Sequence, residues 1–201
     1  MLSALVLAAG ASRRMGSPKA LLRIGETTFL QHIVGTLRAA HINDIVLVLG
    51  ASEERIRENL AWFDGTIAVN RNWHEGQLSS IIAGLDALQP GHSRGVMICP
   101  VDHPLMTKDL LKALVHAFET SDKKIILPTH KGRRGHPVIF DATLFDELRR
   151  APREVGARAV VRNHPDDLEE VPTPERGVGV DIDTMQDYEK EILHRSYRHS
   201  P

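Results

Sequence analysis

Short apolar runs alternate with longer amphipathic stretches along almost the whole chain. Within each run the apolar residues follow one another directly, which is typical of parallel strands buried on both faces. The stretches between the runs repeat their apolar residues at the spacing of a helix. The sequence therefore predicts strands at residues 2–8, 44–49, 66–69, 95–99, 124–127, 137–140 and 178–182.

Capping residues mark where several helices should begin. Thr28 stands three residues before Gln31, which is the spacing of a capping box, and Thr107 and Thr184 each precede a helical stretch. Ser52 is followed by two glutamates, which favour the first turn of a helix. We expect helices after these four capping residues and at 78–88, with shorter helical pieces between residues 141 and 177.

The alternation of strands and helices predicts an α/β fold. We expect a single-domain Rossmann-like three-layer sandwich, in which helices cover both faces of a mostly parallel sheet. A chain of 201 residues without a linker or repeat is best interpreted as one domain spanning residues 1–201. The polar tail at about 194–201 is expected to be frayed.

Composition excludes several classes of function. The net charge of −1 gives no basic field for nucleic acid. Cys99 is the only cysteine, so an internal disulfide and a zinc site of several thiolates are excluded, and a reducing cytoplasm fits. No run approaches the ~18 apolar residues of a membrane span. The first strand is predicted from residue 2, so we expect no signal peptide.

The loop after the first predicted strand combines glycines with cations. Gly10 and Gly16 let the backbone approach a ligand closely or adopt a positive φ, and Arg13, Arg14 and Lys19 add positive charge. The spacing matches neither the P-loop nor the dinucleotide fingerprint. We interpret the loop as a third kind of phosphate-binding loop, with a basic surface loop as the alternative.

Carboxylates follow two of the predicted strands. Asp102 leaves the strand at 95–99 between two prolines, and Asp181 and Asp183 stand at the end of the last predicted strand, on one face of it. Ligands of open parallel sheets bind beyond the carboxyl ends of the strands. A carboxylate beside a phosphate calls for a hard cation between them, so we predict that Asp102 binds Mg²⁺ and that Asp181 or Asp183 completes the site. As alternatives, Asp102 caps a helix or stabilises a turn, and Asp181 and Asp183 are solvent-exposed acids without a ligand.

Two further segments are candidates for substrate contacts. Residues 70–80 contain Trp73, Gly76, Gln77 and two serines before a predicted helix, whose free N–H groups favour an anion. The serines have the alternative role of capping that helix. Gly132-Arg-Arg-Gly-His-Pro137 is a second basic, glycine-rich turn that could grip the phosphate of a second substrate, or serve as a plain hairpin connection.

These motifs together resemble a known family. The patterns L-A-A-G-x-S-x-R-M-G-x-x-K, N-x-x-W-x-x-G-x-x-x-S, D-x-P, G-H-P and D-I-D-T stand in this order between residues 7 and 184. They resemble the molybdenum cofactor nucleotidyltransferases, most closely the cytidylyltransferase branch, over about residues 3 to 192. The family usually has proline after D-I-D-T where this chain has Met185, a change that we expect to leave activity intact.

The resemblance implies roles for individual residues. It implies nucleotide contacts for Leu7, Ala8, Ala9, Gly10, Arg14, Lys19 and Ser80. It implies catalytic roles for Lys19, Arg14 and Asp102, and acceptor-side contacts for Gly76, Gln77, Gly135 and His136. It implies metal ligation by Asp102 and Asp183, with Asp181 as the alternative second ligand. The related guanylyltransferases usually read L-A-G-G where this chain has Ala9, which favours cytosine over guanine.

The expected activity is therefore transfer of CMP from CTP to the terminal phosphate of molybdopterin, with release of pyrophosphate. The resemblance implies Mg²⁺, with Mn²⁺ as the alternative, and a molybdoenzyme or its chaperone as the recipient of the product. Two other hypotheses stay open. One keeps the fold but takes GTP or a sugar phosphate; the other is a non-catalytic carrier of molybdenum cofactor.

Overall fold

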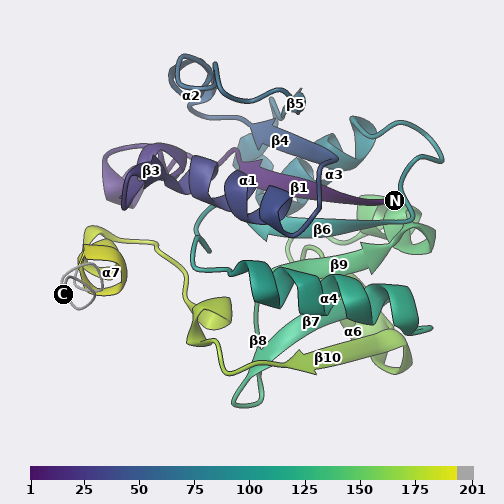
Figure 1. Cartoon of the computed structure of the whole chain (residues 1–201). Helices are drawn as coiled ribbons and strands as arrows, with labels where there is room; N and C mark the ends of the chain where they lie inside the picture. Colours follow the sequence, from purple (N-terminus) through teal and green to yellow (C-terminus); the bar gives the residue numbers. More distant parts are fainter. Residues whose placement is uncertain (194–201) are drawn as a thin grey trace.

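The computed structural model describes residues 1–193, so the predicted frayed tail lies outside the described residues. Its centre is a sheet with the strand order β10-β7-β9-β6-β1-β4-β5, and β8 pairs with β7 at one side (Figure 1). The strands are β1 (Leu2–Ala8), β4 (Ile45–Leu49), β5 (Thr66–Val69), β6 (Gly95–Pro100), β7 (Ile125–His130), β8 (Arg133–Arg134), β9 (Val138–Asp141) and β10 (Leu168–Pro172). A separate small hairpin joins β2 (Arg23–Ile24) to β3 (Thr27–Thr28).

The sheet is mostly parallel, as predicted. β1 pairs in parallel with β4 and β6, β4 with β5, and β10 with β7. Within this sheet, among the described strands, only β8 and β9 run antiparallel to their neighbours. The likeness to a solved structure reported below and this topology together confirm the α/β class.

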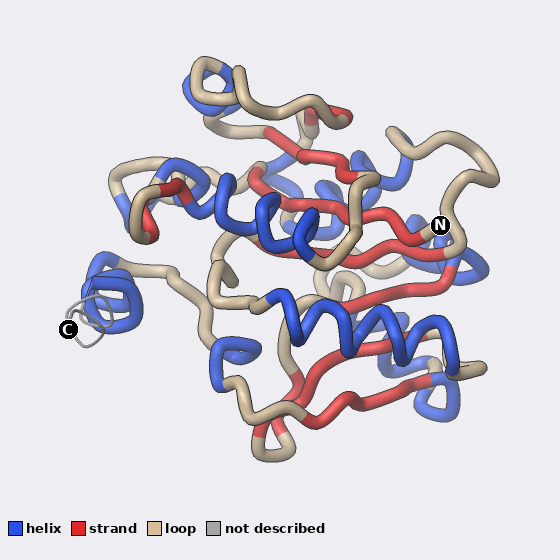
Figure 2. The backbone as a smooth tube through the Cα atoms, viewed as in Figure 1, coloured by secondary structure: helices blue, strands red, loops and turns tan. Residues whose placement is uncertain are grey.

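Helices cover both faces of the sheet. They are α1 (Phe29–Ala39), α2 (Glu53–Arg57), α3 (Gln77–Asp86), α4 (Lys108–Thr120), α5 (Phe145–Arg150), α6 (Arg158–Asn163) and α7 (Met185–Tyr188). Alternate residues of β1 divide the core. Val6 packs in a cluster with α1 and α4, whereas Leu5 packs with α3, α5 and α6 on the opposite face (Figures 1 and 2). No helix within residues 1–193 is long and apolar enough to cross a membrane.

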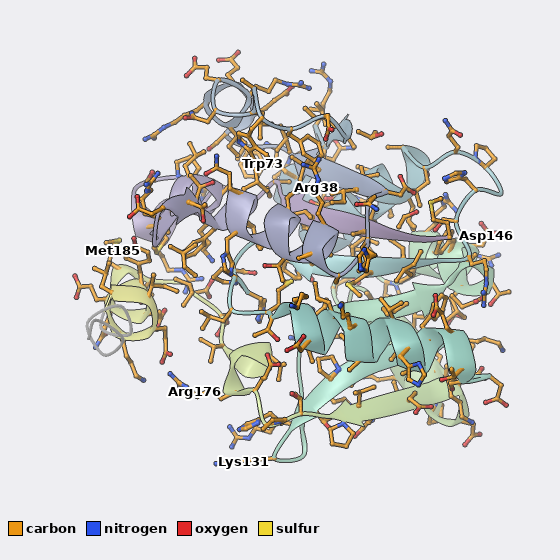
Figure 3. All side chains as sticks on the ribbon, viewed as in Figure 1. Arg38, Trp73, Lys131, Asp146, Arg176 and Met185 are labelled. Atoms are coloured by element: carbon orange, nitrogen blue, oxygen red, sulfur yellow. The ribbon has the colours of Figure 1, made fainter. Side chains whose placement is uncertain are left out.

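The predicted caps are present at three helices. Thr28 and Gln31 form a full capping box at α1, and Thr107 Oγ1 accepts the N–H of Leu110 at α4. Thr184 forms a capping box with its N3 residue at α7. This cap starts α7 without proline at its first position, where Met185 is exposed (Figure 3). Ser52 makes no such bond at α2.

The predicted strand at 178–182 is wrong. A 3-10 turn, η6 (Arg176–Gly179), leads into an irregular segment there. Its backbone bonds to loops instead of to a strand: Val178 accepts the N–H of His136 at 2.8 Å, and Ile182 donates to the carbonyl of Asp102 at 2.8 Å. Residues 176–183, which we call the strap, therefore cross the carboxyl end of the sheet and connect its loops.

The edge strand β10 was not among the predicted elements. It pairs in parallel with β7 at one edge of the sheet, and its residues Leu-Glu-Glu-Val-Pro carry the polar side chains that an exposed edge tolerates. The connection between the strands predicted at 124–127 and 137–140 folds back as the β7–β8 hairpin, with Lys131 near its tip (Figure 3).

Candidate active site

A pocket of about 410 Å³ lies where β1 and β6 end, and we call it the nucleotide pocket. The adjacent strands hold its floor, because Val101 N–H donates to the carbonyl of Leu7 at 3.1 Å. The pocket brings together most of the residues that sequence analysis singled out, namely Leu7, Ala8, Ala9, Gly10, Arg14, Lys19, Gly76, Gln77, Ser80, Asp102 and Asp183. Their individual roles remain predictions.

The loop after β1 is shaped by two positive-φ residues. Ser12 has a φ of 48° and Gly16 a φ of 66°, and between them runs the turn η1 (Arg13–Met15). The Ser12 hydroxyl accepts the backbone N–H of Lys19 at 3.1 Å, which closes the loop. A Cβ at Gly10 would meet no protein atom within 4 Å, so the backbone there is open to the pocket.

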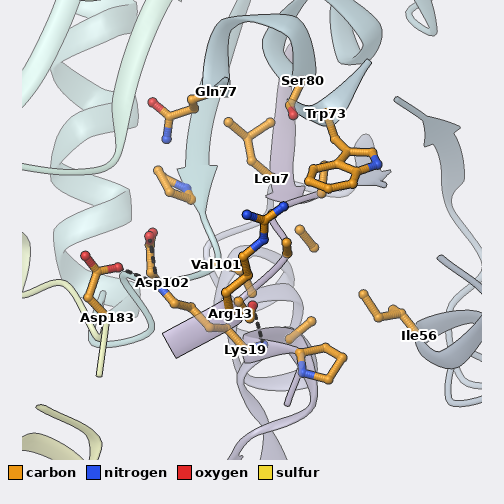
Figure 4. A pocket seen from close by; sticks show the side chains of 18 of the residues that line it. Leu7, Arg13, Lys19, Ile56, Trp73, Gln77, Ser80, Val101, Asp102 and Asp183 are labelled. Atoms are coloured by element: carbon orange, nitrogen blue, oxygen red, sulfur yellow. Dashed lines mark hydrogen bonds and ion pairs between the residues drawn. The ribbon is translucent and has the colours of Figure 1, made fainter. Parts of the chain in front are cut away.

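Lys19 is the centre of the charged end of the pocket. Its Nζ lies 3.4 Å from Asp102 Oδ2 and 2.5 Å from Asp183 Oδ1, and its side chain is 12% exposed (Figure 4). Arg14 reaches the other oxygen of Asp183 at 2.9 Å. The hydrogen bond from Lys19 lowers the pKa of the Asp183 carboxyl below its ordinary value. Two carboxylates from distant segments thus converge on one cationic group.

This donor set fits a hard divalent cation. Carboxylate oxygens are the ligands that Mg²⁺ and Mn²⁺ prefer, and Mg²⁺ is typically held by one or two carboxylates together with substrate phosphates. Within residues 1–193 there is no group of three or more His, Cys, Asp or Glu side chains arranged to hold a metal on their own. The pair of Asp102 and Asp183 therefore suits a metal that arrives with a phosphate ligand.

Asp181 does not share a face with Asp183, contrary to the prediction. The prediction required a strand, and the strap is irregular at this point. Asp181 is exposed and lines a second pocket, whereas Asp183 faces Lys19. The two acids therefore belong to different pockets, and only Asp183 lies beside Asp102 across a shared lysine.

Asn70 organises the segment before α3. It is only 4% exposed, and its amide donates to the hydroxyls of Ser79 at 2.8 Å and Ser80 at 3.0 Å. Neither serine caps the helix, because Gly76 occupies the N-cap position with a φ of 97°. The helix N-terminus thus carries no side-chain cap, and Gly76 and Gln77 line the nucleotide pocket there.

A second pocket of about 580 Å³ adjoins the first, and Gln77 lines both. We call it the acceptor pocket. It contains the predicted residues Gly135 and His136, and Gly135 packs so closely that a Cβ would lie 2.2 Å from the carbonyl oxygen of Val178. Its floor is apolar, and its wall carries the four arginines Arg134, Arg153, Arg158 and Arg162.

Two histidines form one side of the acceptor pocket. The rings of His103 and His136 are 4.6 Å apart, and the Nδ1 atom of each is buried without a hydrogen-bond partner among residues 1–193. Burial, with the neighbouring His103, lowers the pKa of His136 to about 4. Burial also lowers the pKa of His103. Both imidazoles are therefore neutral near pH 7.

This geometry is that of a nucleotide-binding α/β fold, and a comparison with known families agrees. The description "MobA-like NTP transferase domain" applies to the family whose sequence profile matches residues 4–168. The chain belongs to this family. The match includes the loop after β1, Asp102 and His136 but ends before the strap.

Relatives of the chain carry different names. A protein named nicotine blue oxidoreductase, from Paenarthrobacter nicotinovorans, is 30% identical over 90% of this chain and 91% of its own length. A probable molybdenum cofactor guanylyltransferase from Mycobacterium avium is 33% identical over 63% of this chain and 62% of its own length. The family is therefore established, but its members differ in their named activities.

A solved relative shares the whole fold. The crystal structure of Rv0371c from Mycobacterium tuberculosis superposes with a TM-score of 0.84 and 26% identity, over 96% of this chain and 97% of that one. A second structure of Rv0371c, in complex with manganese, has a TM-score of 0.78 and 24% identity over 96% of this chain and 98% of that one. Together with the strand topology, the first likeness confirms the predicted fold class.

Sequence analysis did not single out several residues that shape the pockets. Asn70 gave no signal except its place at the start of the N-x-x-W motif. Gly50 was not singled out either, although a Cβ added there would come within 2.9 Å of the Trp73 Cβ. The glycine after β4 could have indicated such a close approach. Arg153 and Arg158 lie outside every recognised motif, so only the fold brings them to the acceptor pocket.

Proposed function

We propose that this protein transfers CMP from CTP to the terminal phosphate of molybdopterin and releases pyrophosphate. The observation that carries the proposal is that Asp102 and Asp183 both contact Lys19, in a pocket that the glycine-containing basic loop after β1 also lines. Such an arrangement combines carboxylates for a metal with cations for a triphosphate. Membership of the MobA-like NTP transferase family supports nucleotidyl transfer.

The reaction needs no protein nucleophile. A phosphomonoester has a second pKa of about 6, so the acceptor phosphate is already an anion near pH 7. One of its oxygens attacks the α-phosphorus of CTP and forms a new P–O bond. The bond from the α-phosphorus to the bridging oxygen breaks, and pyrophosphate leaves with the electron pair. The protein therefore has to position the two substrates and stabilise negative charge.

Lys19 and Arg14 supply that stabilisation. When the triphosphate binds, their cationic groups pair with its oxygens instead of with Asp102 and Asp183. The two carboxylates are then free to hold a divalent cation. That cation, when bound, would offset the charge on the phosphate oxygens. Mg²⁺ is the expected ion; the manganese complex of Rv0371c supports a divalent ion in general, with Mn²⁺ as the alternative.

Cytosine is proposed as the base because of Ala9. This residue is 3% exposed and lines the nucleotide pocket, and its methyl group lies beside the backbone of Gly50. The methyl group narrows the pocket compared with the glycine that is usual in the related guanylyltransferases. The name guanylyltransferase, which several relatives carry, argues for GTP instead, so the choice of base needs a direct test.

The acceptor is proposed to bind in the acceptor pocket. Its arginines suit phosphate and its apolar floor suits a flat ring system, while Gln77 stands between the two substrates. His136 and Gly135 would contact the pterin. The product would then pass to a molybdoenzyme or its chaperone, which is the partner implied by this chemistry.

A relative's name makes oxidoreductase activity a second candidate. The nicotine blue oxidoreductase matches 90% of this chain. The loop after β1 lacks the close glycine pair of a dinucleotide fingerprint, which favours the transferase. Loss of nicotine blue colour in the presence of a reduced nicotinamide would identify the oxidoreductase. Transfer to a sugar phosphate, and nucleotide or cofactor binding without turnover, are the remaining alternatives.

The test is pyrophosphate release from CTP and GTP in the presence of Mg²⁺ and molybdopterin, compared with Asp102→Ala. We expect release from CTP, and its loss in the variant. Release from GTP alone would contradict the Ala9 argument while keeping the transferase. Binding of molybdopterin without release from either nucleotide would favour a carrier, and release only with sugar phosphates would change the acceptor.

A further inference from the structure

Arg13 differs from the other cations of the loop after β1. Arg14 pairs with Asp183, and Lys19 pairs with both Asp102 and Asp183. The Arg13 guanidinium makes no hydrogen bond or ion pair with any residue between 1 and 193, although it lines the nucleotide pocket. An unpartnered guanidinium in a pocket is a group that a ligand can use.

The side chain of Arg13 is directed away from the charged end of the pocket. In Figure 4 its guanidinium is directed toward the side of the pocket that carries Leu7 and Trp73, away from Asp183. Positions next to the carboxylates suit the α-phosphate, so the end near Trp73 suits the base. The short turn η1 after Ser12, whose φ is 48°, sets the direction in which Arg13 leaves the loop.

Among the described residues, no acidic side chain lines the base end of the pocket. The acidic residues that line the nucleotide pocket are Asp102 and Asp183, and both bind Lys19 at the other end. Trp73, whose Cβ lies close to Gly50, brings its indole to the pocket lining, and Arg13 contributes a fork of N–H donors. A base at this end therefore meets a stacking surface and a paired donor.

We propose that Arg13 selects the base of the nucleotide by donating two hydrogen bonds to adjacent acceptors. Cytosine offers O2 and N3, and guanine offers O6 and N7, as two neighbouring acceptors. Uracil has an N–H at N3 between its carbonyl oxygens, and adenine has an amino group next to N7, so each opposes one arm of the fork. Arg13 thus discriminates CTP and GTP from UTP and ATP. The inference rests on the proposed nucleotide site.

The test is equilibrium binding of CTP, GTP, UTP and ATP, each with Mg²⁺ and without acceptor, so that no transfer occurs. Wild-type protein should bind CTP or GTP at least about 10-fold more tightly than UTP and ATP. Arg13→Ala should remove this preference. Arg13→Lys keeps the charge but lacks the fork, so it should lose the preference as well. Circular dichroism checks that both variants fold.

Arg55→Ala is the matched control. Arg55 is exposed near the loop, with its guanidinium 3.5 Å from the Ser17 hydroxyl, and it does not line the pocket. This variant removes the same charge and should keep the preference. Equal weakening of all four nucleotides by Arg13→Ala would overturn the inference and assign Arg13 to the phosphates. An unchanged preference would overturn it and leave the nucleotide site intact, whereas absence of binding by wild-type protein would overturn both proposals.

Discussion

Replacing Lys19 with alanine separates a catalytic role from a structural one. The Lys19 ammonium contacts Asp102 and Asp183 at 3.4 and 2.5 Å, and the proposed mechanism places it on the phosphates during transfer. Removing one such group typically lowers kcat by about 10²–10³-fold. We expect a loss of this size in steady-state pyrophosphate release, with a smaller increase in KM for CTP.

The same substitution should cost little stability. The carboxylates of Asp102 and Asp183 are 31% and 32% exposed, so water can solvate them when Lys19 is absent. Partly exposed ion pairs typically contribute about 0–1 kcal/mol. Thermal unfolding should therefore move by only a few degrees. Lys108→Ala, which removes an exposed lysine of α4, is the control for charge. A Lys19→Ala enzyme with kcat within threefold of wild type would refute the assigned role.

Three further predictions concern the pockets and the surface. Gly135→Ala should clash with the carbonyl oxygen of Val178, lower the free energy of unfolding by about 1–3 kcal/mol and raise KM for the acceptor. Gly35→Ala, in an open position of α1, should not destabilise, and equal stability of the two variants would contradict this packing. The hydrogen bond to Glu147 raises the pKa of His164, so its stabilising effect is full below about pH 6.5 and disappears as pH rises through the raised pKa. In denaturant unfolding, His164→Gln should have a lower free energy of unfolding than wild type near pH 5.5, and this difference should vanish at high pH. A difference that grows with pH would contradict a raised pKa for His164. Chelation with EDTA should abolish pyrophosphate release and added Mg²⁺ or Mn²⁺ should restore it, whereas release that survives EDTA would exclude the metal role.

Much of the fold could be predicted because local signals agreed with the tertiary structure. β1 and β6 are buried on both faces, so their sequences are continuously apolar, and Thr28 and Thr107 bond to the helices that they precede. The loop after β1 was predictable because its glycines and cations are close in sequence. Asp102 was predictable because it directly follows a buried strand.

The sequence-based predictions failed where a residue pattern typical of one structure occurs in another, or where no local pattern exists. Val178, Val180 and Ile182 alternate with Gly179 and Asp181 in the sequence, which imitates a strand, but the buried Val178 and Ile182 anchor the strap to neighbouring loops. β10 is an edge strand, so its glutamates conceal the pattern. Arg134 belongs to the basic turn that was recognised, but Arg153, Arg158 and Arg162 of the acceptor pocket lie in or near α6, which carries no motif, so no local signal placed them near Gln77.

The central claim is that the α-phosphate of CTP becomes joined to the acceptor. The most direct measurement supplies CTP labelled either at the α- or at the γ-phosphate, together with Mg²⁺ and molybdopterin, and separates the products. The proposed reaction places α-label in the pterin product and γ-label in pyrophosphate, and Asp102→Ala should abolish both transfers. Transfer of γ-label to the pterin, or an unlabelled pterin in both experiments, would contradict the claim.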